Sequence, residues 1–188
     1  DNTDPVERLY IQWGFSQFFP SKAMCAHVTS WNRQTSVKFR VDVAMMCKLG
    51  FDIGLDGLSD EERMFCQQAV QTYHRLKPVI LDGDLYRLAS PYEGEHMAVM
   101  HVDATQTKSV LYTYNIHPRY AETLYPIRLQ GLDPDKQYKV EEINLMPGAK
   151  SSFSGNGQTY SGDYLMKVGL RLFSTQATSS HLFELTAL

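Results

Sequence analysis

Acidic side chains stand in the first four residues, Asp1-Asn2-Thr3-Asp4. Asp4 has the features of a helix N-cap, because Pro5 follows it in the first turn and Glu7 stands three residues after it. Asp1 lies in front of that turn and has no such local role. If the turn follows a barrel strand, its carboxylate faces an active site, where it can act as a general acid or base.

A second polar group, Trp31-Asn32-Arg33-Gln34, follows a short apolar run at 23–29. An indole ring can pack on the apolar face of a pyranose, and amides can bond its hydroxyls. Trp31, Asn32 and Gln34 are therefore candidates for sugar contacts. Polar residues after a strand are also commonly no more than solvated, and the sequence leaves both interpretations open.

The cysteines and histidines are weaker candidates for a catalytic or metal-binding role than these acidic and polar residues. Cys25 and His27 share one face of the run 23–29, but no third group orients them as a catalytic pair, so we expect both to pack in the core. The three cysteines lack CxxC spacing and are expected to be buried free thiols. The histidines show no HxH or HExxH spacing, so we expect no metal site. Arg40 could order the face of the barrel that carries the carboxylates, or it could simply pair with another group within the barrel.

Helices and strands alternate over residues 1–81. The spacing of apolar residues predicts strands at 23–29 and 51–55, and helices over 5–19, 39–47 and 59–77. Ser59 and Glu62 form a capping box, and Pro78 is expected to end the last helix. Such alternation is typical of parallel βα units, although two strands and three helices cannot close a barrel.

The helix expected over 5–19 carries two apolar stripes. One follows the spacing of Val6, Leu9, Tyr10 and Trp13, and the other consists of Ile11, Phe15, Phe18 and Phe19. A helix with two such stripes is buried on most sides. We therefore expect packing partners that these 188 residues do not fully supply.

The hydrophobic period changes to two after residue 81. Alternation predicts strands at 85–90, 97–103, 109–116, 126–130, 137–145, 164–173 and 181–187. Seven short strands joined by turns favour an antiparallel sandwich. The tyrosines and phenylalanines of this region, among them Tyr112, Tyr114, Tyr138 and Phe173, are expected to be mainly core residues, although some could form a sugar-stacking platform.

Composition excludes several classes of protein. The net charge is -3 and 43% of the residues are hydrophobic, so neither nucleic acid nor an anionic membrane is an expected partner. No apolar run reaches the roughly 18 residues of a membrane span. The sequence does not indicate a cellular location.

Five segments, in this order, resemble the C-terminal third of glycoside hydrolase family 36, the α-galactosidases. These segments are DNTDPVERLYIQWG, AHVTS, FRVDVAM with LGFDI, LKPVI with GDLYRLASPYE, and RLQGLDPDKQYKVEEIN. The resemblance implies a fold of α/β plus all-β type. Residues 1–81 would be the last βα units of a (β/α)8 TIM barrel, and residues 82–188 an antiparallel β-sandwich domain.

The resemblance also implies a function. Family members hydrolyse terminal α-linked galactose with retention, using two carboxylates, without cofactor or metal. Asp1 matches the family's proton donor. The nucleophile, which the family places two residues after a lysine on an earlier strand, has no match here, so this chain alone is expected to be inactive and to need the rest of its protein as a partner.

Two alternatives stay open. The chain could be a noncatalytic carbohydrate-binding or structural β module, or part of an enzyme of the raffinose-synthase type that transfers galactose to a sugar. Oligomer formation is possible in each case.

Overall fold

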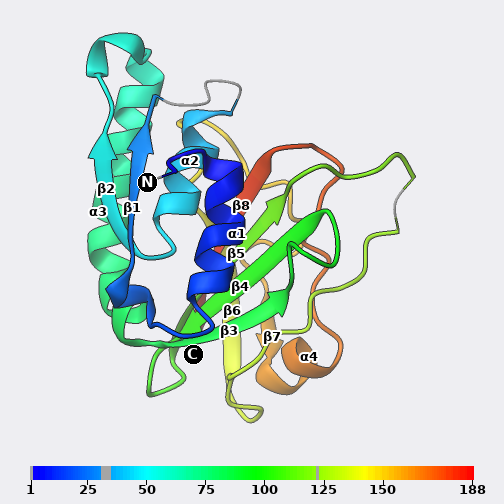
Figure 1. Cartoon of the computed structure of the whole chain (residues 1–188). Coiled ribbons are helices and arrows are strands. Elements are labelled where there is room, and N and C mark those ends of the chain that lie inside the picture. The colour runs from blue at the N-terminus through cyan, green and yellow to red at the C-terminus, as the bar shows by residue number, and fades with distance from the viewer. Residues whose placement is uncertain (1, 31–34, 122) are drawn as a thin grey trace.

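The computed structural model describes residues 2–30, 35–121 and 123–188. Its first part alternates helices and strands, as predicted (Figure 1). The elements are α1 (Pro5–Phe15), η1 (Ser21–Ala23), β1 (Cys25–Thr29), α2 (Val37–Ala44), β2 (Lys48–Asp52), η2 (Leu55–Gly57) and α3 (Asp60–Asp82). β1 and β2 pair in parallel, with Thr29 opposite Asp52 at the end of both strands.

Three predicted helix ends are wrong. The helix predicted over 39–47 ends at Ala44, so that β2 begins at Lys48, before the strand predicted at 51–55. The first helix stops at Phe15, because the backbone leaves it through a turn at Ser16, and not at Phe19. Pro78 does not end α3, which continues to Asp82. A proline inside a helix removes one hydrogen bond, but Val79 and Ile80 are buried in the core, and their packing holds the last turn in place.

The second part is built around one six-stranded antiparallel sheet. Its elements are β3 (Asp84–Ala89), β4 (His96–Val102), β5 (Lys108–Asn115), β6 (Gln137–Ile143), β7 (Thr159–Ser161), α4 (Gly162–Lys167) and β8 (Ser179–Ala187). The strands lie in the order β3-β4-β5-β8-β6-β7, so β8 is inserted between β5 and β6.

Two of the predicted strands are wrong. Within 164–173 the chain forms the end of α4, because Ser161 caps a helix there through a bond from the Tyr164 N–H to its Oγ (3.1 Å). The segment 126–130 makes only an isolated bridge, between Ile127 and Leu170. The other five predicted strands correspond to β3, β4, β5, β6 and β8.

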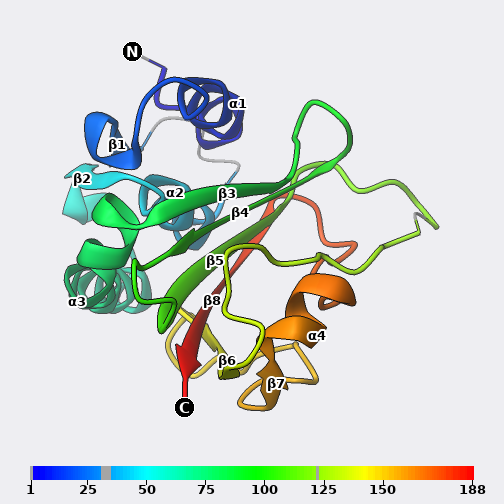
Figure 2. The same ribbon diagram turned by 90° about the horizontal axis from the view of Figure 1, so that it is seen from below.

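The sheet separates two apolar cores. Helices α1 to α3 cover one of its faces, and α4 with the long connections covers the other (Figure 2). β4 shows the division most clearly: Met97 and Val99 belong to the core under the helices, whereas Ala98, Met100 and Val102 belong to the opposite core. Burial on both faces explains why β4 has no exposed residue.

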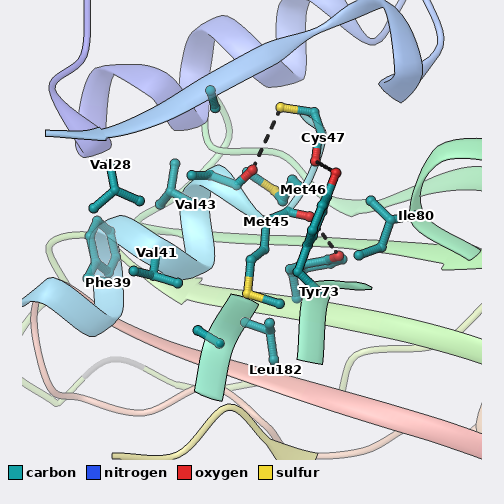
Figure 3. Packing of buried hydrophobic residues seen from close by; sticks show 14 of the residues in the cluster. Val28, Phe39, Val41, Val43, Met45, Met46, Cys47, Tyr73, Ile80 and Leu182 are labelled. Carbon is teal, nitrogen blue, oxygen red and sulfur yellow. Dashed lines mark hydrogen bonds between the residues drawn. The ribbon is translucent and has the colours of Figure 1, made fainter. Parts of the chain in front are cut away.

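The core under the helices joins the two parts of the chain. Val28 of β1, Phe39 and Val41 of α2 and Leu182 of β8 belong to one cluster (Figure 3). Tyr73 of α3 contributes a polar link, since its hydroxyl donates to the Cys47 carbonyl (2.9 Å) and accepts from the Leu49 N–H (3.3 Å). The buried carbonyl group is thereby satisfied within the core.

Candidate active site

The carboxyl ends of β1 and β2 meet at one edge of the parallel pair, where α/β folds commonly bind ligands. A hollow of about 210 Å³ lies beside this edge. Its lining comes from the end of β1, from α2, from the segment after β2 and from α3, and includes Ser30, Arg40, Ile53, Gly54, Leu58 and Glu62. We take this edge as the candidate site.

The N-terminal turn is tied to the same edge. The Thr29 hydroxyl at the end of β1 donates to the Thr3 hydroxyl (3.2 Å). Asn2 accepts a bond from the Asp4 N–H through its side-chain oxygen (2.9 Å). The residues directly before α1 are therefore positioned at the carboxyl end of β1.

Asp4 is an N-cap, as predicted. Its carboxylate accepts bonds from the N–H groups of Val6 (2.9 Å) and Glu7 (3.1 Å), and Pro5 occupies the first helical turn. These bonds satisfy donors that have no partner within the helix. Asp4 thus serves the start of α1 and is not a candidate for catalysis.

The predicted site residues lie outside the described residues. This is the case for the proposed acid Asp1 and for the sugar-contact candidates Trp31, Asn32 and Gln34. Their neighbours are described: Ser30 lines the hollow, and Ser36 caps α2 through a bond from the Phe39 N–H (3.1 Å). The roles given to the four residues stay predictions.

Arg40 connects the site to the scaffold. Its guanidinium donates to the carbonyls of Thr29 (2.6 Å) and Ser36 (3.5 Å), and its side chain also lines the hollow. Arg40 therefore fixes the end of β1 against the start of α2 and brings a positive charge to the site. Sequence reasoning left its role open, because a contact between residues 29 and 40 has no local signal.

Cys25 and His27 are not core residues, and the prediction that they pack inside is wrong. The two lie on the exposed face of β1, whereas Ala26 and Val28 on the other face are buried under the helices. Of the expected buried thiols, Cys47 and Cys66 are buried. Burial raises the pKa of Cys47 to about 12 and also raises the pKa of Cys66, so neither is a nucleophile at neutral pH.

Three of the four aromatic residues singled out in the second part belong to the core, as expected. The hydroxyls of Tyr112, Tyr114 and Tyr138 donate to the carbonyls of Met45, Asp42 and Gln106, respectively. Phe173 is only partly buried and stacks on His96.

Among the residues that the structure describes, no three His, Cys, Asp or Glu side chains come together as ligands for a metal ion. In the same part of the chain, no helix is long and apolar enough to cross a membrane.

Comparison with known families matches most of the chain in two pieces. Residues 1–83 match the family described as Melibiase, and residues 96–185 match the one described as Glycosyl hydrolase family 36 C-terminal domain.

Curated proteins match over the same length. Probable alpha-galactosidase G of Emericella nidulans is 33% identical over 177 residues, which cover 91% of this chain and 22% of that protein. Alpha-galactosidase AgaA of Geobacillus stearothermophilus is 31% identical over 181 residues, which cover 94% of this chain and 25% of that protein. The chain thus spans about a quarter of the length of the curated relatives it matches.

Solved structures are similar over the entire chain. GH36 alpha-galactosidase AgaB from Geobacillus stearothermophilus has a TM-score of 0.87 at 31% identity, covering 100% of this chain and 25% of that one. Variants of AgaA from the same organism, in complex with raffinose, 1-deoxygalactonojirimycin and stachyose, have TM-scores of 0.86, 0.87 and 0.87 at 29%, 30% and 32% identity, with the same coverage.

Proposed function

Because this chain belongs to glycosyl hydrolase family 36, we propose that it is part of a retaining α-galactosidase that removes terminal α-linked galactose from oligosaccharides. The similarity to α-galactosidases over 91% or more of the chain is the observation that carries this proposal. Residues 1–81 would complete a catalytic barrel, and residues 82–188 would form a C-terminal β-sandwich domain. The alternation of helices and parallel strands before the antiparallel sheet is consistent with that division.

Asp1 is the proposed general acid and base. It directly precedes Asn2, and the bond between Thr3 and Thr29 holds this turn at the carboxyl end of β1. In a retaining glycosidase the acid gives its proton to the leaving oxygen while a second carboxylate, about 5 Å away, attacks the sugar. The acid must be protonated beforehand, and burial or a neighbouring carboxylate raises its pKa for that purpose. The nucleophile would come from outside these 188 residues.

Trp31, Asn32 and Gln34 are proposed to contact the sugar. They follow Ser30, which lines the hollow beside the β1 and β2 edge. Raffinose and stachyose, which the AgaA variants bind, end in galactose and expose both ring faces and hydroxyls. An indole and two amides would provide a stacking surface and hydrogen-bond partners for such a sugar.

The test replaces Asp1 with asparagine in the full-length protein. For raffinose and other substrates with poor leaving groups, we expect kcat/KM to fall by about 10²-fold to 10⁴-fold, because proton donation to the leaving oxygen is lost. For an activated aryl α-galactoside, whose aryloxide leaves without a proton, the loss of kcat/KM should be much smaller. Initial rates on the two substrate types measure this difference.

Asp4→Asn is the matched control. Asparagine is as good an N-cap as aspartate, so this variant should keep parental activity on both substrate types. Small and equal losses on both substrates for Asp1→Asn would overturn the assignment of the acid. Absence of any α-galactosidase activity in the parental full-length protein would overturn the function itself.

A further inference from the structure

A groove of about 440 Å³ lies in the second part of the chain and shares no residue with the hollow at the β1 and β2 edge. His96, Tyr125, Arg128, Gln130 and Phe173 line it, together with small and apolar residues of the same segments. His96 alternates along β4 with Met97, which faces the helices, so the groove opens on the opposite face of the sheet. The chain that follows β5 runs on this face, on the same side as α4 (Figure 2).

The floor of the groove is fixed by stacking and hydrogen bonds. The rings of His96 and Phe173 stack with centroids 4.5 Å apart and an interplanar angle of 30°. His96 Nδ1 is bonded to Asn115 Oδ1 (3.0 Å), and the Asn115 amide donates to Ser174 Oγ (3.1 Å) and Ser179 Oγ (2.9 Å). A ligand therefore meets a surface that is already ordered, which lowers the entropic cost of binding.

One wall is the segment 123–130, and it presents its polar groups outward. Two backbone bonds between Ile127 and Leu170 (2.8 and 3.0 Å) anchor it, and the Ile127 side chain is buried. Tyr125 is 73% exposed. Arg128 and Gln130 are also exposed, and neither side chain makes a hydrogen bond or an ion pair with residues 2–30, 35–121 or 123–188.

This combination of groups suits a sugar better than other ligands. An exposed phenol ring can cover the apolar face of a pyranose, and a guanidinium, an amide and the hydroxyl of Thr123 can bond its hydroxyls. An anion such as phosphate would favour several cations, but Arg128 is the one lysine or arginine among the described lining residues. An apolar peptide segment would leave Arg128 and Gln130 buried without partners.

We propose that this groove is a second, noncatalytic site for oligosaccharides that carry galactose. The identity of the sugar rests on the proposed function, whereas the existence of the site rests on the geometry of the groove. A chain held there as well as at the catalytic edge would have a raised local concentration at the active site.

The experiment uses the full-length protein with its active site saturated by 1-deoxygalactonojirimycin. Calorimetric titration with stachyose should then show a remaining binding event. We expect Tyr125→Ala and Arg128→Ala each to weaken that event at least about fivefold, because stacking and a directional donor are lost. Tyr120→Ala is the matched control, since Tyr120 is a fully exposed tyrosine of the same connection that does not line the groove, and it should leave binding and hydrolysis unchanged.

The outcomes separate the two proposals. Normal hydrolysis of melibiose with no remaining stachyose binding, or with binding that survives both groove variants, would overturn the groove site and leave the α-galactosidase function standing. No hydrolysis, with stachyose binding that depends on Tyr125 and Arg128, would support the groove site and overturn the function. A change in oligomeric state on gel filtration in the groove variants, without a change in sugar binding, would overturn the groove site in favour of a protein contact.

Discussion

Protonation of His101 would destabilise the folded state. This histidine lies fully buried on β4, where Ser21 Oγ is 2.8 Å from its Nε2, while its Nδ1 has no hydrogen-bond partner among the described residues. Burial lowers its pKa from 6.5 to about 4. The imidazole is therefore neutral inside the fold at neutral pH, and adding a proton would place an uncompensated charge in the core.

Stability should therefore fall as the pH falls from about 6.5 toward 4. The unfolded chain binds a proton at His101 near pH 6.5, but the folded chain does so only near pH 4, so acid favours unfolding between these values. The full effect of this residue is roughly 3 kcal/mol, from about 1.4 kcal/mol for each unit of pKa difference. Urea unfolding of the full-length protein at pH 7.5 and at pH 5.5 measures the part of this loss of stability that occurs above pH 5.5.

A pair of variants isolates the contribution of this histidine. His101→Gln cannot bind the proton, so its unfolding free energy should change less between the two pH values than that of the parental protein. His117→Gln removes an exposed histidine and should leave the parental difference in place. Glu142, whose pKa is lowered by its bonds to His181 and Ser151 despite the opposing effect of burial, contributes at lower pH and does not confound this comparison. Equal pH dependence in all three proteins would contradict the prediction.

At the scale of elements, the carboxylate of Asp42 joins α2 to the sheet. It is fully buried and accepts bonds from Lys38 Nζ (2.5 Å), Ser180 Oγ (2.7 Å) and Asn144 Nδ2 (2.6 Å). Ser180 belongs to β8, and Asn144 directly follows β6. This carboxylate therefore connects the helical layer to two strands in the middle of the antiparallel sheet.

Removing the Asp42 carboxylate should strongly destabilise the folded protein. We expect Asp42→Ala to lower the unfolding free energy by about 3–5 kcal/mol, because the largely buried Lys38 ammonium loses its counterion and keeps the Ser180 carbonyl (3.1 Å) as its acceptor. The Ser180 hydroxyl and the Asn144 amide also lose a carboxylate acceptor. Asp163→Ala breaks another i,i+4 pair, with Lys167, in which both side chains are about half exposed or more, and should cost less than about 1 kcal/mol. Chemical unfolding of the full-length protein compares the two, and similar losses would show that Asp42 does not join the layers.

Local patterns predicted most elements but not their arrangement. The predicted strands at 97–103 and 109–116 match β4 and β5 to within a residue at each end, because both are rich in apolar and β-forming residues bounded by polar turns. That both faces of these strands meet a core could not be read from a period of two. The insertion of β8 between β5 and β6 depends on pairings between segments far apart in the sequence, such as Asn115 with Ser179 and Ile143 with Leu182, and has no local signal. The apolar pattern over 164–173 predicts a strand where α4 ends, although Ser161 and Asp163, a cap and a first-turn acid, indicate a helix start.

In the candidate site, too, the sequence predicted contacts between near neighbours but not contacts that form only when elements pack together. The N-cap role of Asp4 is a contact over two or three residues and followed from the sequence. The contact between Thr3 and Thr29, and the bond from Arg40 to the Thr29 carbonyl, form only when the parallel units pack. The exposure of Cys25 and His27 was missed for a related reason. Their face of β1 was expected to be covered as in a closed barrel, and the described residues do not cover it.

At the scale of the whole molecule, α1 and the turn after it present an apolar surface to solvent. Ile11, Phe15, Phe18 and Phe19 are all exposed, Phe18 by 84%, and the rings of Phe15 and Phe19 stack 4.5 Å apart. They are the second stripe predicted to need packing partners beyond these 188 residues. Contiguous exposed apolar side chains usually mark an interface. The proposed barrel would bury this stripe against a neighbouring βα unit.

Phe18→Ser should therefore have opposite effects in two contexts. In a protein of only these 188 residues it should reduce aggregation and the binding of an apolar dye, because it removes exposed hydrophobic surface. In the full-length protein it should lower the unfolding free energy by about 1.5–3 kcal/mol, since a buried phenylalanine would be lost. Tyr120→Ser, at an exposed aromatic residue away from the stripe, should change neither property. Unchanged stability of the full-length Phe18→Ser protein would mean that the stripe remains exposed there, and the proposed barrel contact at α1 would then be wrong.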